Sequence, residues 1–213
     1  MSVAARQVVE VRHPLVQHKL GMLRDRETST HLFRQLVNEL TLLLTYEATK
    51  ELVTEEVDVD TPLERTTVQR ISGKKVAVCP ILRAGLGMLD GVLSLISGAR
   101  VGFIGLYRNE ETLEPVEYYV KLPADIAERD VILLDPMLAT GNSTAAAVRT
   151  VKEAGAQSVR LIALIAAPEG IDRIASEHPD VAIVVAGIDR ELNDRGYILP
   201  GLGDAGDRLF GTK

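Results

Sequence analysis

The chain has 213 residues, of which 46% are apolar and 25% charged, and these proportions exclude a disordered, fibrous or membrane-embedded protein. A length below roughly 250 residues predicts a single domain, 1–213, around one core. The net charge of −6 excludes an overall field that would attract nucleic acid or an anionic membrane, so we expect neither as a partner.

The first part of the chain, to about residue 52, is predicted to be helical from Pro14 onward. Between Leu32 and Leu44 the apolar spacing forms one face, and Thr28 or Ser29 is suited to cap its start. This face buries either against the domain or against another subunit. Its length leads us to expect a homodimer or a higher homo-oligomer.

Two less regular pieces follow. The valines of "LVTEEVDVD" predict a strand, and "TTVQRISGKK" is a polar connection or a short ribbon. Cys79, in the next apolar run, is the only cysteine, which excludes an internal disulfide and favours a reducing, cytoplasmic location. Its apolar neighbours Val78 and Pro80 favour a buried structural thiol over a catalytic one.

From residue 75 to residue 188, short apolar runs alternate with helical patterns. The predicted strands are "KVAVCP", "RVGFIGLY", "DVILLDP", "SVRLIALIAA" and "DVAIVVAG", and the predicted helices are "LGMLDGVLSLI", "STAAAVRTVKEAG" and "EGIDRIASEH". This alternation predicts βαβ units, so the expected fold class is α/β, with a mainly parallel sheet flanked by helices.

Two segments depart from this alternation. At about 101–122 the acidic turn "RNEETLEP" and the alternating "VEYYVKLP" predict a projecting β-hairpin arm. The tail, about 188–213, is dense in Gly and Asp and too irregular for a helix or a buried strand. Because it still carries apolar residues, we expect it to form an ordered lid or pocket wall.

The loop after Asp135 is predicted to bind a phosphorylated sugar. In an open α/β sheet, ligands bind beyond the carboxyl ends of the strands, and Asp135 follows one. The turn 140–144 then begins a helix, where free backbone N–H groups and the helix dipole favour an anion, and Gly141 allows these amides to converge. The carboxylate of Asp135, an acceptor only, suits a pair of sugar hydroxyls. The alternative is that Asp135 and the hydroxyl residues only cap the helix.

The string "DPMLATGNS" resembles the phosphoribosyl-pyrophosphate motif of the type I phosphoribosyltransferases, in the form found in the uracil phosphoribosyltransferase family. The resemblance implies that this loop binds 5-phospho-α-D-ribose 1-diphosphate (PRPP), and that one more binding residue is Asp204. The loop residues implied are Asp135, Pro136, Met137, Leu138, Ala139, Thr140, Gly141, Asn142 and Ser143. Many relatives have a second glycine where Asn142 stands, and we expect the loop to survive this change because Asn tolerates left-handed conformations.

Three further stretches carry the same resemblance. "PILRAGLGM" and "GLYRNEETLEPVEYY" are similar to the family's pyrophosphate loop and flexible hairpin, which implies that Arg83 and Arg108 bind PRPP and act with Asp204 in catalysis. A surface arginine without a role is the alternative for Arg83, and a solvated turn is our expectation for Glu110, Glu111 and Glu114. "GYILPGLGDAGDRLFGT" resembles the family's uracil-binding tail and implies a uracil site whose residues are Ile198, Gly203, Asp204 and Ala205. Tyr197 either closes this pocket or belongs to the core.

The resemblance implies an enzyme that converts uracil and PRPP to UMP and diphosphate in pyrimidine salvage. It further implies magnesium (Mg2+) bound mainly through PRPP, with no protein metal site. Bacterial members of the family include GTP-activated ones, so GTP is a candidate effector, but no stretch of this sequence identifies a GTP site. Two alternatives stay open: a PRPP-binding RNA-binding regulator of pyrimidine genes, against which the net acidity counts, and a phosphoribosyltransferase for another base, against which "ILPGLGDAG" counts.

Overall fold

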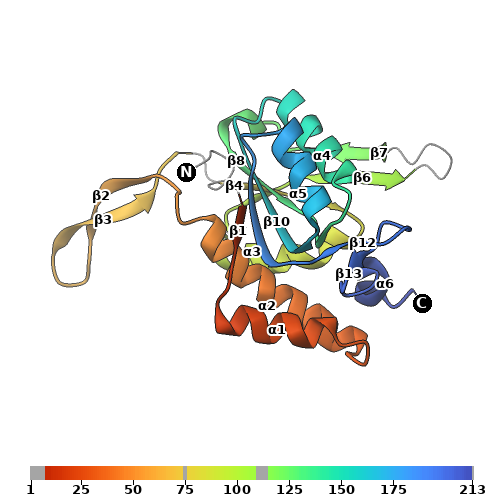
Figure 1. Ribbon diagram of the computed structural model, residues 1–213. Helices are drawn as coiled ribbons and strands as arrows, with labels where there is room; N and C mark the ends of the chain where they lie inside the picture. The colour runs from red at the N-terminus through yellow and green to blue at the C-terminus, as the bar shows by residue number, and fades with distance from the viewer. Residues whose placement is uncertain (1–7, 74–75, 109–114, 213) are drawn as a thin grey trace, which may run out of the picture.

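The computed structural model describes residues 8–73, 76–108 and 115–212 around one central sheet (Figure 1). The strand order is β1-β11-β10-β8-β4-β6-β7, with β5 beside β4 and β9 beside β10. Every pairing is parallel except that of β6 with β7, which confirms the expected mainly parallel sheet. The strands are β1 (Val8–Glu10), β4 (Val76–Leu82), β5 (Arg100–Val101), β6 (Phe103–Arg108), β7 (Pro115–Lys121), β8 (Asp130–Leu134), β9 (Met137–Leu138), β10 (Ser158–Ala166) and β11 (Ala182–Ile188).

Helices cover both faces of the sheet, because its inner strands are apolar on both sides (Figure 1). Side chains alternate along β8: Ile132 and Leu134 join the core under α1, α2 and α3, and Val131 and Leu133 join the core under α4 and α5. The helices are α1 (Pro14–Arg24), α2 (Thr30–Ala48), α3 (Leu89–Leu95), α4 (Asn142–Glu153), α5 (Pro168–Glu177) and α6 (Ala205–Phe210). No described helix has both the length and the hydropathy needed to cross a membrane.

The N-terminal region contains two helices and a strand. Helix α1 ends at Arg24, and α2 begins after Ser29, whose side chain accepts a hydrogen bond from Leu32 N at 3.3 Å. Ser29 is therefore the cap, and Thr28 is not. The apolar face of α2 is buried in the core of its own chain, which confirms the first of the two alternatives for that face. Strand β1, beside β11, was not predicted from the helical spacing.

Two hairpins extend the fold. Strands β2 (Thr54–Asp60) and β3 (Arg65–Ile71) pair antiparallel as a separate sheet that projects from the body (Figure 1). Antiparallel pairing of β6 with β7 confirms the expected hairpin arm. The acidic turn of that arm, with Glu110, Glu111 and Glu114, lies outside the described residues.

The tail is more regular than its composition indicated. It contains the short strands β12 (Glu191–Leu192) and β13 (Ile198–Leu199), followed by helix α6. The side chain of Asp204 caps α6 by accepting from Asp207 N at 2.9 Å, and Gly211 ends it with a φ of 68°. The prediction that the tail is too irregular for a helix was therefore wrong, because one cap and one left-handed glycine are enough to bound a six-residue helix.

Candidate active site

Two loops meet at the carboxyl ends of β4 and β8. These strands are parallel neighbours, with Pro80 opposite Leu134, so Arg83 and Asp135 leave the sheet at the same edge. A Cβ on Gly85 would lie 2.3 Å from the carbonyl oxygen of Leu134, so only glycine lets the two backbones approach this closely. Both loops line a cavity of about 230 Å³.

Most of the residues predicted to bind PRPP line this cavity. They are Arg83, Asp135, Met137, Ala139, Thr140, Gly141, Asn142 and Ser143. Pro136 and Leu138 are buried instead, and they position the loop through their backbones: Pro136 O accepts from Leu164 N, and Leu138 O accepts from Ala167 N. The alternation of half-buried and buried residues in the loop follows from the short strand β9 within it.

The carboxylate of Asp135 is held in a fixed orientation at the cavity wall. Thr144 Oγ1 donates to its Oδ2 at 2.9 Å, and Met137 N donates to its Oδ1 at 3.3 Å. Burial raises the pKa of Asp135 to about 6, although both hydrogen bonds act in the opposite direction. Asp135 is not the cap of α4, since Gly141 takes that position, so the capping alternative is wrong for Asp135. Among the hydroxyl residues, Thr140 does accept from a first-turn amide, that of Asn142, at 3.5 Å.

The turn before α4 leaves donors available to a ligand. Gly141 has a φ of 78° and, as a glycine, has no side chain with which to cap the N–H groups of the first turn. Asn142 is already helical, so its tolerance of left-handed conformations is not used. Its Oδ1 is buried without a hydrogen-bond partner among the described residues, as expected of a site that a ligand completes.

Gly170, on α5, supports this loop and was not recognised from the sequence. A Cβ at this position would lie 2.4 Å from Ala139 O and 2.8 Å from Leu138 O. Helix α5 therefore contacts the backbone of the loop 135–143 directly. Because the two segments are 31 residues apart, no local pattern indicates the contact.

The two arginines occupy different positions at the site. Arg83 is exposed at the cavity, and among the described carboxylates none forms an ion pair with it, so its guanidinium is available for phosphate oxygens. Its place at the cavity favours a role in binding phosphate over the alternative of a surface arginine without a role. Arg108 is the last residue of β6, two residues after Leu106, which lines the cavity.

The tail packs against the Arg83 loop. A Cβ on Gly87 would lie 2.6 Å from Leu209 of α6, and a Cβ on Gly206 would lie 3.9 Å from Ala84. Gly203 and Asp204 line a second cavity of about 340 Å³, together with Tyr197, which is 41% exposed and therefore is not a core residue. Asp204 and Asp135 thus line two different cavities.

Backbone geometry leaves both polar groups of Ile198 directed away from β12. Tyr197 O accepts from Asn193 N, and Leu199 O accepts from Arg190 N. Successive residues of a strand direct their backbone groups to opposite sides, so the N–H and C=O of Ile198 point to the other side. Ile198 and Ala205 are themselves buried, at 3% and 2% exposure.

The sheet order, the hairpin arm and the Asp135 loop beside the Arg83 loop define a type I phosphoribosyltransferase. A family model described as uracil phosphoribosyltransferase matches residues 9–212. The chain belongs to the uracil phosphoribosyltransferase family.

Individual relatives agree with this assignment. The uracil phosphoribosyltransferase of Clostridium botulinum (strain Eklund 17B / Type B) is 60% identical over 207 residues, which cover 97% of this chain and 99% of that protein. That of Thermoanaerobacter sp. (strain X514) is 57% identical over 208 residues, 98% of this chain and 99% of that protein. Among solved structures, the AQ2163 protein from Aquifex aeolicus superposes with a TM-score of 0.92 at 42% identity, covering 97% of this chain and 99% of that chain. The hypoxanthine phosphoribosyltransferase of Trypanosoma cruzi, with a TM-score of 0.51 at 10% identity over 75% of this chain and 76% of that chain, shares the fold alone.

Proposed function

We propose that this protein transfers the phosphoribosyl group of PRPP to uracil, giving UMP and diphosphate in pyrimidine salvage. The observation that carries the proposal is that the Arg83 loop lines the cavity with Asp135 and also contacts the tail, in which the backbone donor and acceptor of Ile198 both point away from β12. Family membership supports the same reaction.

In the proposed mechanism the chain mainly binds and orients PRPP. The amides of the turn 140–143 bind the 5-phosphate, and the Asp135 carboxylate accepts from the ribose hydroxyls. The bond from ribose C1 to diphosphate breaks, a bond from C1 to uracil N1 forms, and the N1 proton is lost. Arg83 and Arg108 stabilise the negative charge that develops on diphosphate. Holding both reactants in place removes much of the entropic barrier.

Uracil selection is assigned to the backbone of Ile198 and to Gly203, Asp204 and Ala205. Along one edge uracil presents both carbonyl and N–H groups, which match a free backbone donor and acceptor. Cytosine has an amino group where the donor requires an oxygen, and an unpaired buried donor strongly disfavours it.

Asp204 is proposed to favour deprotonation of uracil N1 or to stabilise the positively charged sugar. Its side chain also caps α6, so its removal would combine the loss of a helix cap with the loss of the proposed catalytic carboxylate. Asp204→Asn separates them, because Asn caps helices about as well as Asp. Unchanged turnover in this variant would exclude the catalytic role.

Magnesium is proposed to bind mainly through PRPP. No group of three or more metal-ligating side chains occurs in the parts of the chain that the structure describes, and Asp135 is the carboxylate in the PRPP cavity. This donor set fits Mg2+, which prefers phosphate oxygens and water to a protein cage. When bound, the ion would offset charge on the diphosphate.

We also propose a cytoplasmic homo-oligomer with GTP as an effector. The apolar face of α2 is buried within its own chain, so it does not support self-association. The β2–β3 hairpin supports it instead, because the apolar side chains of Val53, Leu63 and Val68 there are 71%, 96% and 37% exposed. Sedimentation of the purified protein tests the oligomer, and turnover with and without GTP tests the effector.

The deciding experiment measures diphosphate release from PRPP with magnesium and, separately, uracil, cytosine, orotate or hypoxanthine. Turnover with uracil alone is the expected result. Turnover with another base would reassign the tail. Binding of PRPP without turnover on any base would refute the enzymatic proposal and favour the RNA-binding regulator, which a salt-dependent RNA-binding assay would then test.

A further inference from the structure

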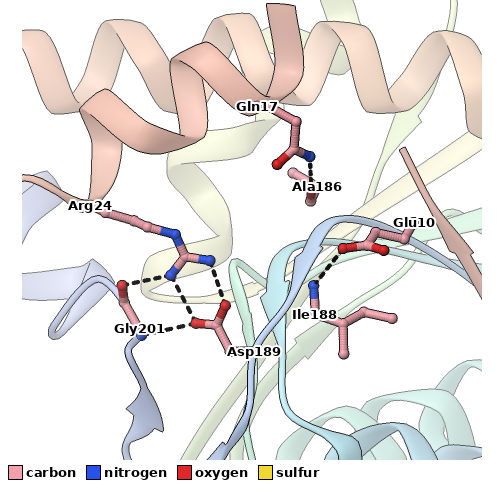
Figure 2. A network of polar contacts seen from close by, with 7 residues as sticks. All are labelled: Glu10, Gln17, Arg24, Ala186, Ile188, Asp189 and Gly201. Carbon is pink, nitrogen blue, oxygen red and sulfur yellow. Dashed lines mark hydrogen bonds and ion pairs between the residues drawn. The ribbon is translucent and has the colours of Figure 1, made fainter. Parts of the chain in front are cut away.

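An ion pair between Arg24 and Asp189 joins the N-terminal helices to the tail (Figure 2). Arg24 is the last residue of α1, and Asp189 directly follows β11. Both terminal nitrogens of Arg24 donate to the two carboxylate oxygens, with Nη1 at 2.8 Å from Oδ2. The side chain of Asp189 is only 4% exposed, so this is a fixed, two-point contact rather than a solvated surface pair.

The same pair binds both backbone polar groups of Gly201. Arg24 Nη1 donates to Gly201 O at 2.7 Å, and Gly201 N donates to Asp189 Oδ2 at 2.9 Å (Figure 2). A free energy cost therefore opposes any displacement of Gly201, since the buried charges would lose hydrogen bonds. Gly201 has a φ of +66°, which a residue with a side chain rarely adopts.

Gly201 lies directly against the carbonyl of Ile198, the residue whose backbone N–H and C=O point away from β12 and to which uracil binding was assigned above. A Cβ on Gly201 would lie 2.1 Å from Ile198 O. In a four-residue turn the first carbonyl often accepts from the fourth N–H, here that of Gly201. In the described hydrogen bonds this N–H donates to Asp189 instead, so the oxygen of Ile198 keeps its capacity to accept from a ligand.

Two further side chains of the N-terminal region hold the end of β11 in place. Gln17 Nε2 donates to Ala186 O at 3.0 Å, and Ile188 N donates to Glu10 Oε1 at 3.3 Å (Figure 2). Asp189 therefore follows a strand end that two other N-terminal side chains also contact.

We propose that Arg24 and Asp189 are positioning residues for the base: by binding the N–H and C=O of Gly201, they leave Ile198 O free to accept from uracil N3–H. This inference rests on the proposed function. Neither residue touches substrate, and the resemblance to the family assigned neither of them a role.

Asp189→Asn tests the inference with little change in size. In the carboxylate, Oδ2 accepts from both Gly201 N and Arg24 Nη1, and Oδ1 accepts from Arg24 Nη2. The amide removes the charge and places its NH2 group against a donor in either orientation: against Gly201 N, which is then released toward Ile198 O, or against Arg24 Nη2, which weakens the contact that holds Gly201. We expect the KM for uracil to rise about tenfold or more, while the KM for PRPP changes by less than about twofold. Equal changes in both KM values, or no change in either, would overturn the inference.

Two further variants separate positioning from general stability. Arg24→Lys keeps the charge but not the fork, so it should shift the KM for uracil in the same direction by a smaller factor, and it remains informative if Asp189→Asn does not fold. Glu39→Gln removes the ion pair of Lys19 with Glu39 between α1 and α2, at 2.6 Å, and the hydrogen bonds described for Glu39 go to Lys19 and Gln35, both outside the tail. This control should leave the KM for uracil unchanged even if its melting temperature falls.

Turnover of uracil by the unmodified protein distinguishes failure of the proposed function from failure of the positioning inference. If it does not turn over uracil, the proposed function fails. If it does, and both Asp189→Asn and Arg24→Lys bind uracil normally, only the positioning inference fails.

Discussion

Replacing Asp135 with Asn should stabilise the protein and, at the same time, weaken PRPP binding. Burial raises the pKa of this carboxyl to about 6 from its ordinary value of 3.8, so the ionised form opposes folding. The stability that the protonated form contributes is fully present below pH 3.8 and is lost as the pH rises through 6. A difference of two pKa units corresponds to about 3 kcal/mol at pH 8.

The measured gain should be smaller, because Asp135 is partly open to the cavity and water there solvates its charge. We expect about 2 kcal/mol at pH 8, or a rise of about 4 to 8 °C in melting temperature for a chain of this size. At pH 5 the gain should be about half as large, because the unfolded carboxyl is already ionised there while the folded one is mostly protonated. The KM for PRPP should rise by at least about tenfold, because a neutral amide replaces the acceptor that binds the ribose hydroxyls.

Asp130→Asn is the matched control at the other end of the same strand. Its carboxylate is 38% exposed and lies 3.8 Å from Arg160, so its loss should change stability by about 0.5 kcal/mol or less at either pH. Thermal melts at pH 5 and pH 8 check both variants. The quantity to compare is the gain in melting temperature of Asp135→Asn over the unmodified protein. A smaller gain at pH 8 than at pH 5 would refute the burial argument.

Three other predictions concern single contacts. Thr144→Val removes the hydroxyl that lowers the pKa of Asp135, so the acid limb of the pH profile of kcat/KM for PRPP should move up by about one pH unit; an unmoved limb would mean that another group titrates. Gly170→Ala places a Cβ 2.4 Å from Ala139 O and should cost about 1 to 3 kcal/mol and raise the KM for PRPP, whereas Gly21→Ala, with nothing within 4 Å, should do neither. Cys79 is buried and burial raises its pKa to about 12, so iodoacetamide at pH 8 should label it only after unfolding; rapid labelling of the native protein would contradict its placement.

The PRPP loop could be predicted because its chemistry is contiguous in the chain. Asp135 and the turn 140–144 lie within ten residues, and the apolar run before them predicts the strand end from which they leave. Contacts between distant segments gave no such signal. The contact between Gly170 and Ala139 and that between Gly85 and Leu134 depend on how helices and strands pack, which no local window contains. Helix α6 was missed because six residues are too few to show a helical period.

The pair of Arg24 and Asp189 illustrates the same limit most clearly, since the two residues are 165 positions apart and each has an ordinary sequence context. If the proposed function holds, both substrates are bound largely by backbone: the 5-phosphate by the amides after Gly141, and the base by Ile198. A backbone group selects a ligand only as sharply as its orientation is fixed. Specificity for uracil should therefore depend on residues that fix the tail, Arg24 and Asp189 among them, as much as on residues that touch the base. The test is to compare the discrimination between uracil and cytosine in Asp189→Asn and Asp204→Asn. If only Asp204→Asn loses discrimination, specificity depends on the residues that touch the base and not on those that fix the tail.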